Sequence, residues 1–208
     1  MIIGICGFIG SGKDTIADYL VNNHGFRRES FANTLKDAVS AVFGWDRTML
    51  EGRTKEARAW REQVDTWWAE RLRMPDLTPR LMLQIWGTEV CRKGFHDDIW
   101  IASLENKLRT SKDDVVISDC RFPNEIRAIK NAGGKVVRVV RGPEPEWYED
   151  AVAANKGPSH IGWALGQDRL RKFNVHASET SWVGTEFDSV FDNNSSLDHL
   201  FEQVESVL

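Results

Sequence analysis

Hydrophobic residues near the N-terminus change from a continuous apolar run to helical spacing. Ile2–Cys6 is a short run rich in β-branched residues, glycines follow it, and Thr15–Val21 places apolar residues at helical intervals before Gly25. A short continuous run is typical of a buried strand, and spacing at three and four residues is typical of a helix. The pattern therefore predicts a strand, a glycine-rich loop and a helix that ends at a glycine cap.

The next part of the chain is predominantly helical in its pattern. We expect a short second strand within Phe26–Phe31, after which Asn33 can cap a helix. Charged residues and tryptophans then dominate a stretch that two prolines punctuate, which favours a helical insertion. The helical ranges that the pattern predicts are about Asn33–Phe43, the insertion over Asp46–Leu72, Leu81–Cys91 and Ile99–Leu108.

Strands and helices alternate again in the C-terminal half. Val115–Asp119 and Lys135–Val140 are valine-rich runs, and between them Pro123 suits the first turn of a helix that reaches Ala132, closed by the glycine pair at Gly133. The last two elements predicted are a strand over Phe187–Phe191 and a serine-capped helix over Ser196–Val207. This order predicts an α/β fold, with a parallel sheet flanked by helices on both faces.

The length of the chain fits one domain. We expect residues 1–208 to form it, with a core of residues 1–45, 78–141 and 187–208. Residues from about 46 to 77 would form the helical insertion. Residues from about 142 to 186, which are polar and rich in proline, would form a mobile lid.

Composition narrows the class of protein. Hydrophobic residues make up 41% and charged residues 28% of the chain, which are ordinary globular values. No apolar run approaches the roughly 18 residues that a membrane span needs, so no membrane partner is expected. Met1 leads directly into the first strand without a basic signal region, which predicts a cytoplasmic protein. The three cysteines have no metal-ligand spacing and should be reduced residues of the core.

The glycine-rich stretch from Gly7 to Lys13 carries the most specific chemistry. Gly7, Gly12 and Lys13 match the spacing G-x-x-x-x-G-K, in which backbone N–H groups wrap phosphates and the lysine reaches the β- and γ-oxygens. A predicted strand precedes this stretch and a predicted helix follows it. We therefore interpret it, with Gly10 and Ser11, as the ATP-binding P-loop of a phosphotransferase.

The position after the lysine departs from the general P-loop pattern. A serine or threonine normally stands there and binds Mg²⁺, whereas this chain has Asp14, with Thr15 one residue later. Asp14 could hold the metal through water, or it could take a proton as a general base. The sequence does not decide between these two roles.

Asp119 and Arg121 follow a predicted strand at its C-terminal end, where ligands of open α/β sheets bind. Asp119 could orient hydrated Mg²⁺, as the acid of a Walker B strand does, or it could cap the turn before Pro123. Arg121 could contact phosphate or form an ordinary surface pair. The sequence leaves these alternatives open.

Basic residues gather in the predicted insertion. Guanidinium forks suit bidentate capture of phosphate, and Arg58 and Arg61 would share a helix face, although a solvated face is the more common explanation for such a pattern. Lys36 and Asp37 carry the same ambiguity. The residues of the cluster are Arg53, Lys55, Arg58, Arg61 and Arg80, and a second set in the lid, able to close on transferring phosphoryl groups, is Arg169, Arg171 and Lys172.

Six segments together resemble one known family. They are GFIGSGKDT, FANTLKDA, RAWREQVD, TPRLMLQIWGTE, VVISDCRFPNE and HASETSWVG. In combination they are similar to the phage-type deoxynucleoside monophosphate kinases of the P-loop kinase superfamily, over the chain from Met1 to about Asn194. In that family an aspartate after the P-loop lysine is usual. The resemblance implies a P-loop kinase fold and transfer of the γ-phosphoryl group from MgATP to a deoxynucleoside monophosphate, in the cytoplasm of an infected host cell if the source is a phage.

The resemblance also implies roles for individual residues. Those expected to hold ATP are Gly10, Ser11, Gly12, Lys13, Asp14, Thr15, Arg169, Arg171 and Asn193. Those expected to hold the acceptor are Lys36, Asp37, Arg58, Arg61, Trp68, Arg80, Gln84, Thr88 and Glu89, with the tryptophan as a ring on which a base could stack. The catalytic set would be Lys13, Asp14, Asp119 and Arg121. The Mg²⁺ ligands, partly through water, would be Asp14, Thr15 and Asp119.

Two other functions remain open from the sequence. A kinase of the same fold could phosphorylate the hydroxymethyl group of 5-hydroxymethyluracil within phage DNA, with Asp14 or Asp37 as the base that a hydroxyl acceptor needs. The chain could also be a P-loop NTPase or NTP-binding module without an acceptor. The sequence does not fix the oligomeric state, and a homodimer is compatible with it.

Overall fold

The computed structural model describes all 208 residues and divides them into two compact units. The first unit, called the sheet unit below, comprises Met1–Ser30 and Ser111–Leu208. The second, called the helical unit, comprises Phe31–Thr110. Each unit has its own cluster of buried hydrophobic side chains.

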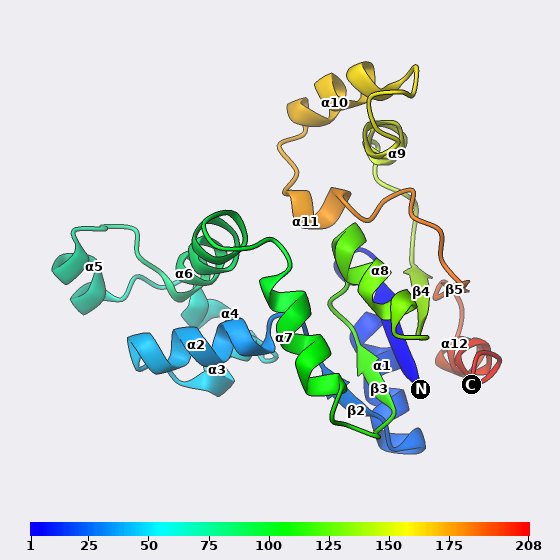
Figure 1. The fold of residues 1–208 in the computed structure, drawn as a ribbon, viewed down its shortest axis with the longest axis horizontal. Helices are drawn as coiled ribbons and strands as arrows, with labels where there is room; N and C mark the ends of the chain where they lie inside the picture. Colours follow the sequence, from blue (N-terminus) through cyan, green and yellow to red (C-terminus); the bar gives the residue numbers. More distant parts are fainter. The chain divides into compact units, whose positions relative to one another are not determined.

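The sheet unit is built on five parallel strands (Figure 1). Their order across the sheet is β2-β3-β1-β4-β5, so the N-terminal strand lies in the centre. The strands are β1 (Ile2–Cys6), β2 (Arg27–Glu29), β3 (Val115–Ile117), β4 (Lys135–Val140) and β5 (Ser189–Asp192). The predicted α/β class with a parallel sheet flanked by helices is therefore confirmed.

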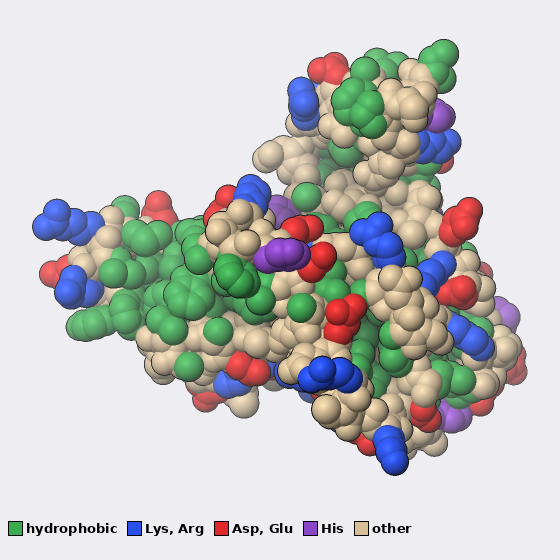
Figure 2. All heavy atoms as spheres, in the orientation of Figure 1, with side chains coloured by type: hydrophobic (Ala, Val, Ile, Leu, Met, Phe, Trp, Pro, Cys, Tyr) green, Lys and Arg blue, Asp and Glu red, His purple; other side chains and the backbone are tan.

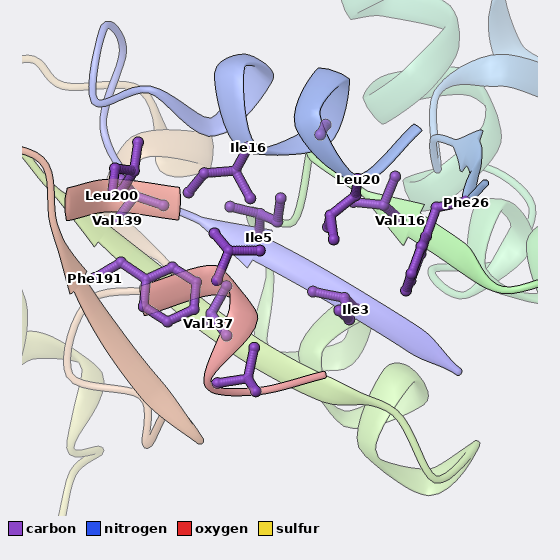
Figure 3. Close-up of a cluster of buried hydrophobic side chains, with 13 residues drawn as sticks. Ile3, Ile5, Ile16, Leu20, Phe26, Val116, Val137, Val139, Phe191 and Leu200 are labelled. Atoms are coloured by element: carbon purple, nitrogen blue, oxygen red, sulfur yellow. The ribbon is translucent and has the colours of Figure 1, made fainter. Parts of the chain in front are cut away.

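Alternation along β1 divides the side chains between the two faces of the sheet. Ile3 and Ile5 lie in a cluster with residues of α1 (Lys13–His24) and α12 (Leu197–Glu205), as Figure 3 shows. The opposite face meets α8 (Pro123–Asn131), where a Cβ on Gly4 would lie 2.6 Å from Ile129 Cδ1. The glycine thus lets α8 pack closely against the central strand of the sheet.

The segment predicted as a lid belongs to the sheet unit and contains three helices. Its helices are α9 (Tyr148–Asn155), α10 (Trp163–Lys172) and α11 (Ala177–Thr180). Gly166 lets α10 pack closely on α9, because a Cβ there would lie 2.7 Å from the Asp150 carbonyl oxygen. Trp182, just after α11, is fully buried.

The helical unit is held together by aromatic side chains. Trp45 stacks on Phe43 and donates its indole N–H to Asp65 at 2.7 Å, and Trp68 donates to the Phe43 carbonyl at 3.1 Å. Figure 2 shows hydrophobic side chains gathered around α5, and Trp67 of this helix is exposed. The helices are α2 (Asn33–Phe43), α3 (Arg47–Glu51), α4 (Lys55–Arg61), α5 (Thr66–Leu72), α6 (Pro79–Gln84), the π-helix η1 (Ile85–Lys93) and α7 (Ile99–Leu108).

Two local predictions were wrong. Asn33 is the first residue of α2 and Ala32 occupies the cap position, without a side-chain cap. The helix predicted over Leu81–Cys91 is α6 followed by a π-helical stretch, which apolar spacing alone does not distinguish from an α-helix. The predicted glycine closure of the helix that reaches Ala132 is confirmed, because Ala132 caps α8 and Gly133 follows it with φ of +77°.

None of the helices is both long enough and apolar enough to cross a lipid bilayer.

Candidate active site

The P-loop joins β1 to α1 and forms a close-fitting backbone cradle. Gly7, Gly10 and Gly12 have φ values of +148°, +79° and +106°, which side-chain-bearing residues rarely adopt. A Cβ on Gly7 would lie 2.6 Å from the Val139 carbonyl oxygen, and one on Gly12 would lie 2.3 Å from Asn193 Nδ2. The loop therefore needs glycine at positions 7 and 12 for space as well as for conformation, and at position 10 for conformation alone.

The P-loop contains one buried polar atom without a hydrogen-bond partner. Ser11 is buried, and its Oγ atom has no hydrogen-bond partner. Asn193, which follows β5, donates from Nδ2 to the Ser11 carbonyl at 2.8 Å and so braces the loop. A buried hydroxyl without a partner costs free energy unless a ligand supplies the missing bond, so the cradle fits a phosphate group.

The Lys13 side chain folds back onto the P-loop. Its Nζ atom donates to the carbonyl oxygens of Gly7 and Phe8, each at 2.7 Å. Burial lowers the pKa of Lys13, and the positive charge of Arg121 lowers it further, while Glu179 and Asp14 act in the opposite direction. A polyanion in the cradle would offer this partly desolvated ammonium a better partner than two neutral carbonyl groups.

The Phe8 side chain anchors the loop to the lid segment. Its ring lies 4.7 Å from the Trp182 ring and 5.4 Å from the Trp147 ring. The Arg138 guanidinium lies 4.9 Å from the centroid of Tyr148 and donates to that residue's hydroxyl at 2.7 Å. Aromatic contacts therefore link the start of the P-loop to both ends of the lid segment.

Asp14 is held by an arginine that the sequence did not reveal. Arg28 on β2 forms an ion pair with the Asp14 carboxylate and donates to Ser118 Oγ at 2.8 Å. Thr15, the next residue of α1, is half-buried. The candidate metal ligand Asp14 therefore already contacts a positive charge of the protein, the guanidinium of Arg28.

Asp119 and Arg121 lie just beyond β3, as predicted. Ser30 donates to Asp119 Oδ2 at 2.5 Å, and Arg121 forms an ion pair with Glu179 of α11. The Glu125 carboxylate accepts from the Arg121 backbone N–H at 2.8 Å, which fixes the turn. Asp119 and Arg121 thus lie at the carboxyl end of the sheet, where α/β proteins bind ligands.

The residues at this edge fit a magnesium ion bound together with a nucleotide. Asp14, Thr15 and Asp119 offer the hard oxygen atoms that Mg²⁺ prefers. The structure contains no cluster of three His, Cys, Asp or Glu side chains able to hold a metal. Mg²⁺ in nucleotide sites usually takes only one or two carboxylates and completes its shell with water and phosphate oxygens, so a full protein cage is not required.

Three predicted acceptor residues crowd together in the helical unit. Arg61 Nη1 donates to the Leu50 carbonyl at 3.3 Å, and its buried Nε atom has no partner. Burial lowers the pKa of Arg61 most, the like charges of Arg80 and Arg58 lower it further, and Glu62 and Glu51 act in the opposite direction. Arg58 donates to the Gly52 carbonyl at 3.0 Å. Arg58 and Arg80 thus place like charges near Arg61, and Arg80 is itself paired with Glu62 at 2.8 Å. The unpaired Nε atom of Arg61 and this excess of cations favour binding of an anion.

Lys36 and Asp37 take part in a network of paired charges. Lys36 Nζ lies 2.8 Å from Glu51 Oε2, and Arg47 pairs with Asp37 at 2.6 Å and also with Glu51. Burial opposes ionisation of Glu51, but Lys36 and Arg47 outweigh it and lower the pKa of this carboxyl. The network ties α2 to α3.

The other residues predicted to contact nucleotides belong neither to the P-loop edge of the sheet nor to the arginine cluster of the helical unit. Trp68 packs edge-on against Phe43 within the aromatic core. Glu89 pairs with Lys93 at 2.9 Å on η1, and Arg169 lies 3.7 Å from the Asp150 carboxylate. Gln84 ends α6, Thr88 lies on η1 and Arg171 is exposed on α10. The roles expected of these residues toward nucleotides stay predictions.

Sequence reasoning missed two charged residues of the site. Arg28 sits in a three-residue strand, and nothing in its neighbourhood marks it as a partner of Asp14. Glu179, the partner of Arg121, lies within HASETSWVG. That segment contributed to the family resemblance, so its acidic residue could have been singled out.

Two curated proteins are similar to this chain. A protein of Acanthamoeba polyphaga mimivirus with the provisional name deoxynucleotide monophosphate kinase is 35% identical over 155 residues, which cover 68% of this chain and 74% of the viral protein. The deoxynucleoside-5′-monophosphate kinase of Escherichia phage T5 is 30% identical, over 60% of this chain and 70% of the phage protein. No family model matches the sequence.

Solved structures give weaker likenesses. Shikimate kinase from Aquifex aeolicus superposes with a TM-score of 0.46 at 11% identity, over 100% of this chain and 95% of that one. Dephospho-CoA kinase from Campylobacter jejuni gives 0.45 at 15% identity, over 99% and 94%. Scores this low carry no argument about function.

Proposed function

The chain belongs to the deoxynucleoside monophosphate kinase family, and we propose that it transfers the γ-phosphoryl group of ATP to the phosphate of a deoxynucleoside monophosphate. An oxygen of the acceptor phosphate attacks the γ-phosphorus, the bond from the γ-phosphorus to the bridging oxygen breaks, and ADP leaves with that oxygen. The products are a deoxynucleoside diphosphate and ADP.

The sheet unit binds the donor in this proposal. Backbone N–H groups of the P-loop and the free Ser11 hydroxyl receive the phosphates, and Lys13 leaves its loop carbonyls to contact the β- and γ-oxygens. Asp14, Thr15 and Asp119 hold hydrated Mg²⁺, which neutralises charge on the phosphates. Arg121, and Arg169 and Arg171 from the lid segment, provide further positive charge, and Asn193 supports the loop.

The helical unit binds the acceptor. Arg58, Arg61 and Arg80 take its phosphate, because an anion offsets the like charges that Arg58 and Arg80 place near Arg61 and supplies an acceptor for the unpaired Nε atom of Arg61. The deoxynucleoside part of the acceptor contacts the other predicted residues, which are Lys36, Asp37, Trp68, Gln84, Thr88 and Glu89.

The crowding of these arginines is the observation that favours a phosphate acceptor over a hydroxyl. A hydroxyl acceptor needs a general base within hydrogen-bond reach, whereas a phosphate acceptor is already anionic and needs cations. Asp14 is ion-paired with Arg28, and Asp37 with Arg47, so both candidate bases already have a cationic partner within the protein.

A transfer assay with γ-labelled ATP and Mg²⁺ tests the proposal. The purified chain is incubated separately with each of the four deoxynucleoside monophosphates, the matching ribonucleotides, plain duplex DNA and duplex DNA that contains 5-hydroxymethyluracil. Label on a deoxynucleoside diphosphate is the expected result. Label retained only in the modified DNA would establish the DNA-kinase alternative, and free phosphate with every acceptor would indicate an NTPase.

A further inference from the structure

Arg28 connects three acceptors from two elements of the sheet unit. Its Nη2 atom pairs with Asp14 and donates to Ser118 Oγ at 2.8 Å, and its Nη1 atom donates to Asp18 at 2.8 Å. Asp14 and Asp18 are four residues apart on α1 and so share one helix face. Ser118 directly precedes Asp119. The guanidinium therefore bridges the start of α1 to the end of β3.

Strand alternation explains why Arg28 reaches this position and its neighbour does not. Arg27 pairs with Glu29, two residues along β2, and with Asp113 at 2.9 Å, so Arg27 and Glu29 share a face of the strand. Arg28 extends from the opposite face, toward α1. Its side chain is only 20% exposed, although Asp14 is 81% exposed.

An exposed carboxylate gains little folding stability from an ion pair, so the contact is better explained by geometry. The planar guanidinium is fixed by three acceptors, which orients the Asp14 side chain more narrowly than a lysine could. Both contacts of Asp14, with Arg28 and with Ser118 at 3.5 Å, use Oδ1. The second carboxylate oxygen, Oδ2, carries neither of them.

We propose that Arg28 is a positioning residue that fixes the orientation of the Asp14 side chain, with Oδ1 bound internally and Oδ2 left available to the hydrated magnesium ion of the nucleotide complex. This inference rests on the proposed function for the identity of the site, and it makes Asp14 a metal-side group rather than a base. Arg28 contacts no reacting atom itself.

The proposal predicts a change in magnesium dependence with a definite sign. Without Arg28 the Asp14 side chain loses its fixed orientation, so Arg28→Gln should raise the Mg²⁺ concentration at half-saturation about tenfold, as loss of partners of metal ligands commonly does. Arg28→Lys keeps the charge but not the fork and should show most of this rise. The acceptor KM should stay within twofold of the unmodified chain.

If Arg28 acted only through its positive charge, its removal would lower the Mg²⁺ concentration at half-saturation instead of raising it. Removing a cation beside the metal would then strengthen Mg²⁺ binding, so a lower half-saturation concentration in Arg28→Gln overturns the proposal, as does an unchanged one. The matched control is Arg27→Gln, on the same strand but the other face, which should leave the Mg²⁺ dependence unchanged. In an Asp14→Asn background, Arg28→Gln should have no further effect if Arg28 acts through Asp14.

A measurement without turnover separates this inference from the proposed function. Calorimetric titration with ADP, at several Mg²⁺ concentrations and without acceptor, should show a weakened Mg²⁺-dependent increment in ADP affinity for Arg28→Gln. A chain that phosphorylates no deoxynucleotide but shows this loss would refute the function and keep the role of Arg28. Thermal unfolding of Arg28→Gln and Arg28→Lys, compared with the unmodified chain, checks that both variants fold.

Discussion

The candidate phosphate-binding cations of the sheet unit and of the helical unit differ in the partners that they have within the protein. Lys13 donates to carbonyls of its own loop, and Arg121 pairs with Glu179. In the helical unit, Arg61 has a buried donor without an acceptor and lies near two like charges. The cations of the first set have internal partners that a ligand must replace, whereas the second set contains one buried donor, Arg61 Nε, that has no partner to lose.

This difference predicts that the two units would gain binding free energy from a phosphate group in different ways. A nucleotide at the P-loop exchanges existing hydrogen bonds for stronger, charge-assisted ones, so the net gain depends on how much stronger the new bonds are. An anion at the arginine cluster relieves repulsion that the free protein already contains. The four tests below should therefore show different effects on activity and stability in the two units.

The largest effect is expected from Lys13→Ala. It removes the cation closest to the transferring phosphates in the proposed complex and should lower kcat/KM at least about 10³-fold, or about 4 kcal/mol. The fold should be kept, because the lowered pKa of Lys13 means that the folded protein disfavours its charged form. Steady-state kinetics and circular dichroism melting measure both quantities. Retained turnover would refute the P-loop assignment, and Lys112→Ala, an exposed lysine of the same unit, is the control.

Arg61→Met tests the helical unit and should come second. The acceptor KM should rise about 30- to 100-fold, equivalent to about 2–3 kcal/mol, with the ATP KM unchanged. The melting temperature should not fall, since the substitution removes a desolvated cation with an unpaired donor. Arg71→Met, at an exposed position of α5, should change neither quantity. A lower melting temperature with an unchanged acceptor KM would make Arg61 a purely structural residue.

A pair of glycine variants should have an intermediate effect and tests whether the P-loop cradle is preformed. Gly12→Ala combines φ of +106° with a Cβ 2.3 Å from Asn193 Nδ2, whereas Gly10→Ala has φ of +79° and no atom within 4 Å. Both variants carry backbone strain, of about 1–2 kcal/mol, and only the first has a clash in addition. Chemical unfolding and ADP titration should both rank Gly12→Ala as the more damaging. Equal effects would show that the loop relaxes away from Asn193.

The sheet and the P-loop could be predicted from sequence because their signals are local. Ile2–Cys6, the glycine spacing and Lys13 are contiguous, and the strand ranges 2–6 and 135–140 agree with β1 and β4. The two units of the structure, in contrast, depend on contacts that no local pattern encodes. The division into core, insertion and lid stays a prediction.

The partners of the charged residues could not be predicted in the same way. Arg28 meets Asp14 only because β2 is parallel to β3 and the face of a three-residue strand is set by its register, Arg28 opposite Val116. Glu179 reaches Arg121 from a helix 58 positions away in sequence. The resemblance to a family pointed to the cations of both units, but it gave no information on which of them are already paired.

The smallest effect should come from Glu51→Gln, which tests whether the paired charges of the helical unit are structural. Glu51 is 22% exposed and holds Lys36 and Arg47, so its loss should destabilise the chain by about 1–2 kcal/mol at pH 7. Glu62→Gln removes the carboxylate of the exposed pair with Arg80 and should cost less than about 1 kcal/mol. Urea unfolding followed by tryptophan fluorescence suits both variants, because Trp45, Trp60 and Trp68 belong to the helical core.

The pH dependence gives the sharper form of this last test. Because the folded protein lowers the pKa of Glu51, the unfolded chain binds more protons at acidic pH, and the contribution of this carboxylate is present above its unfolded pKa of about 4.3. It is lost as the pH falls through the lower, folded value. The difference in unfolding free energy between the unmodified chain and Glu51→Gln should therefore be constant from pH 6 to 7 and shrink below about pH 4.3. A difference that persists unchanged at pH 3 would mean that packing of the side chain, rather than its charge, ties α2 to α3, and the contrast between paired and unpaired cations within the helical unit would then rest on Arg61 alone.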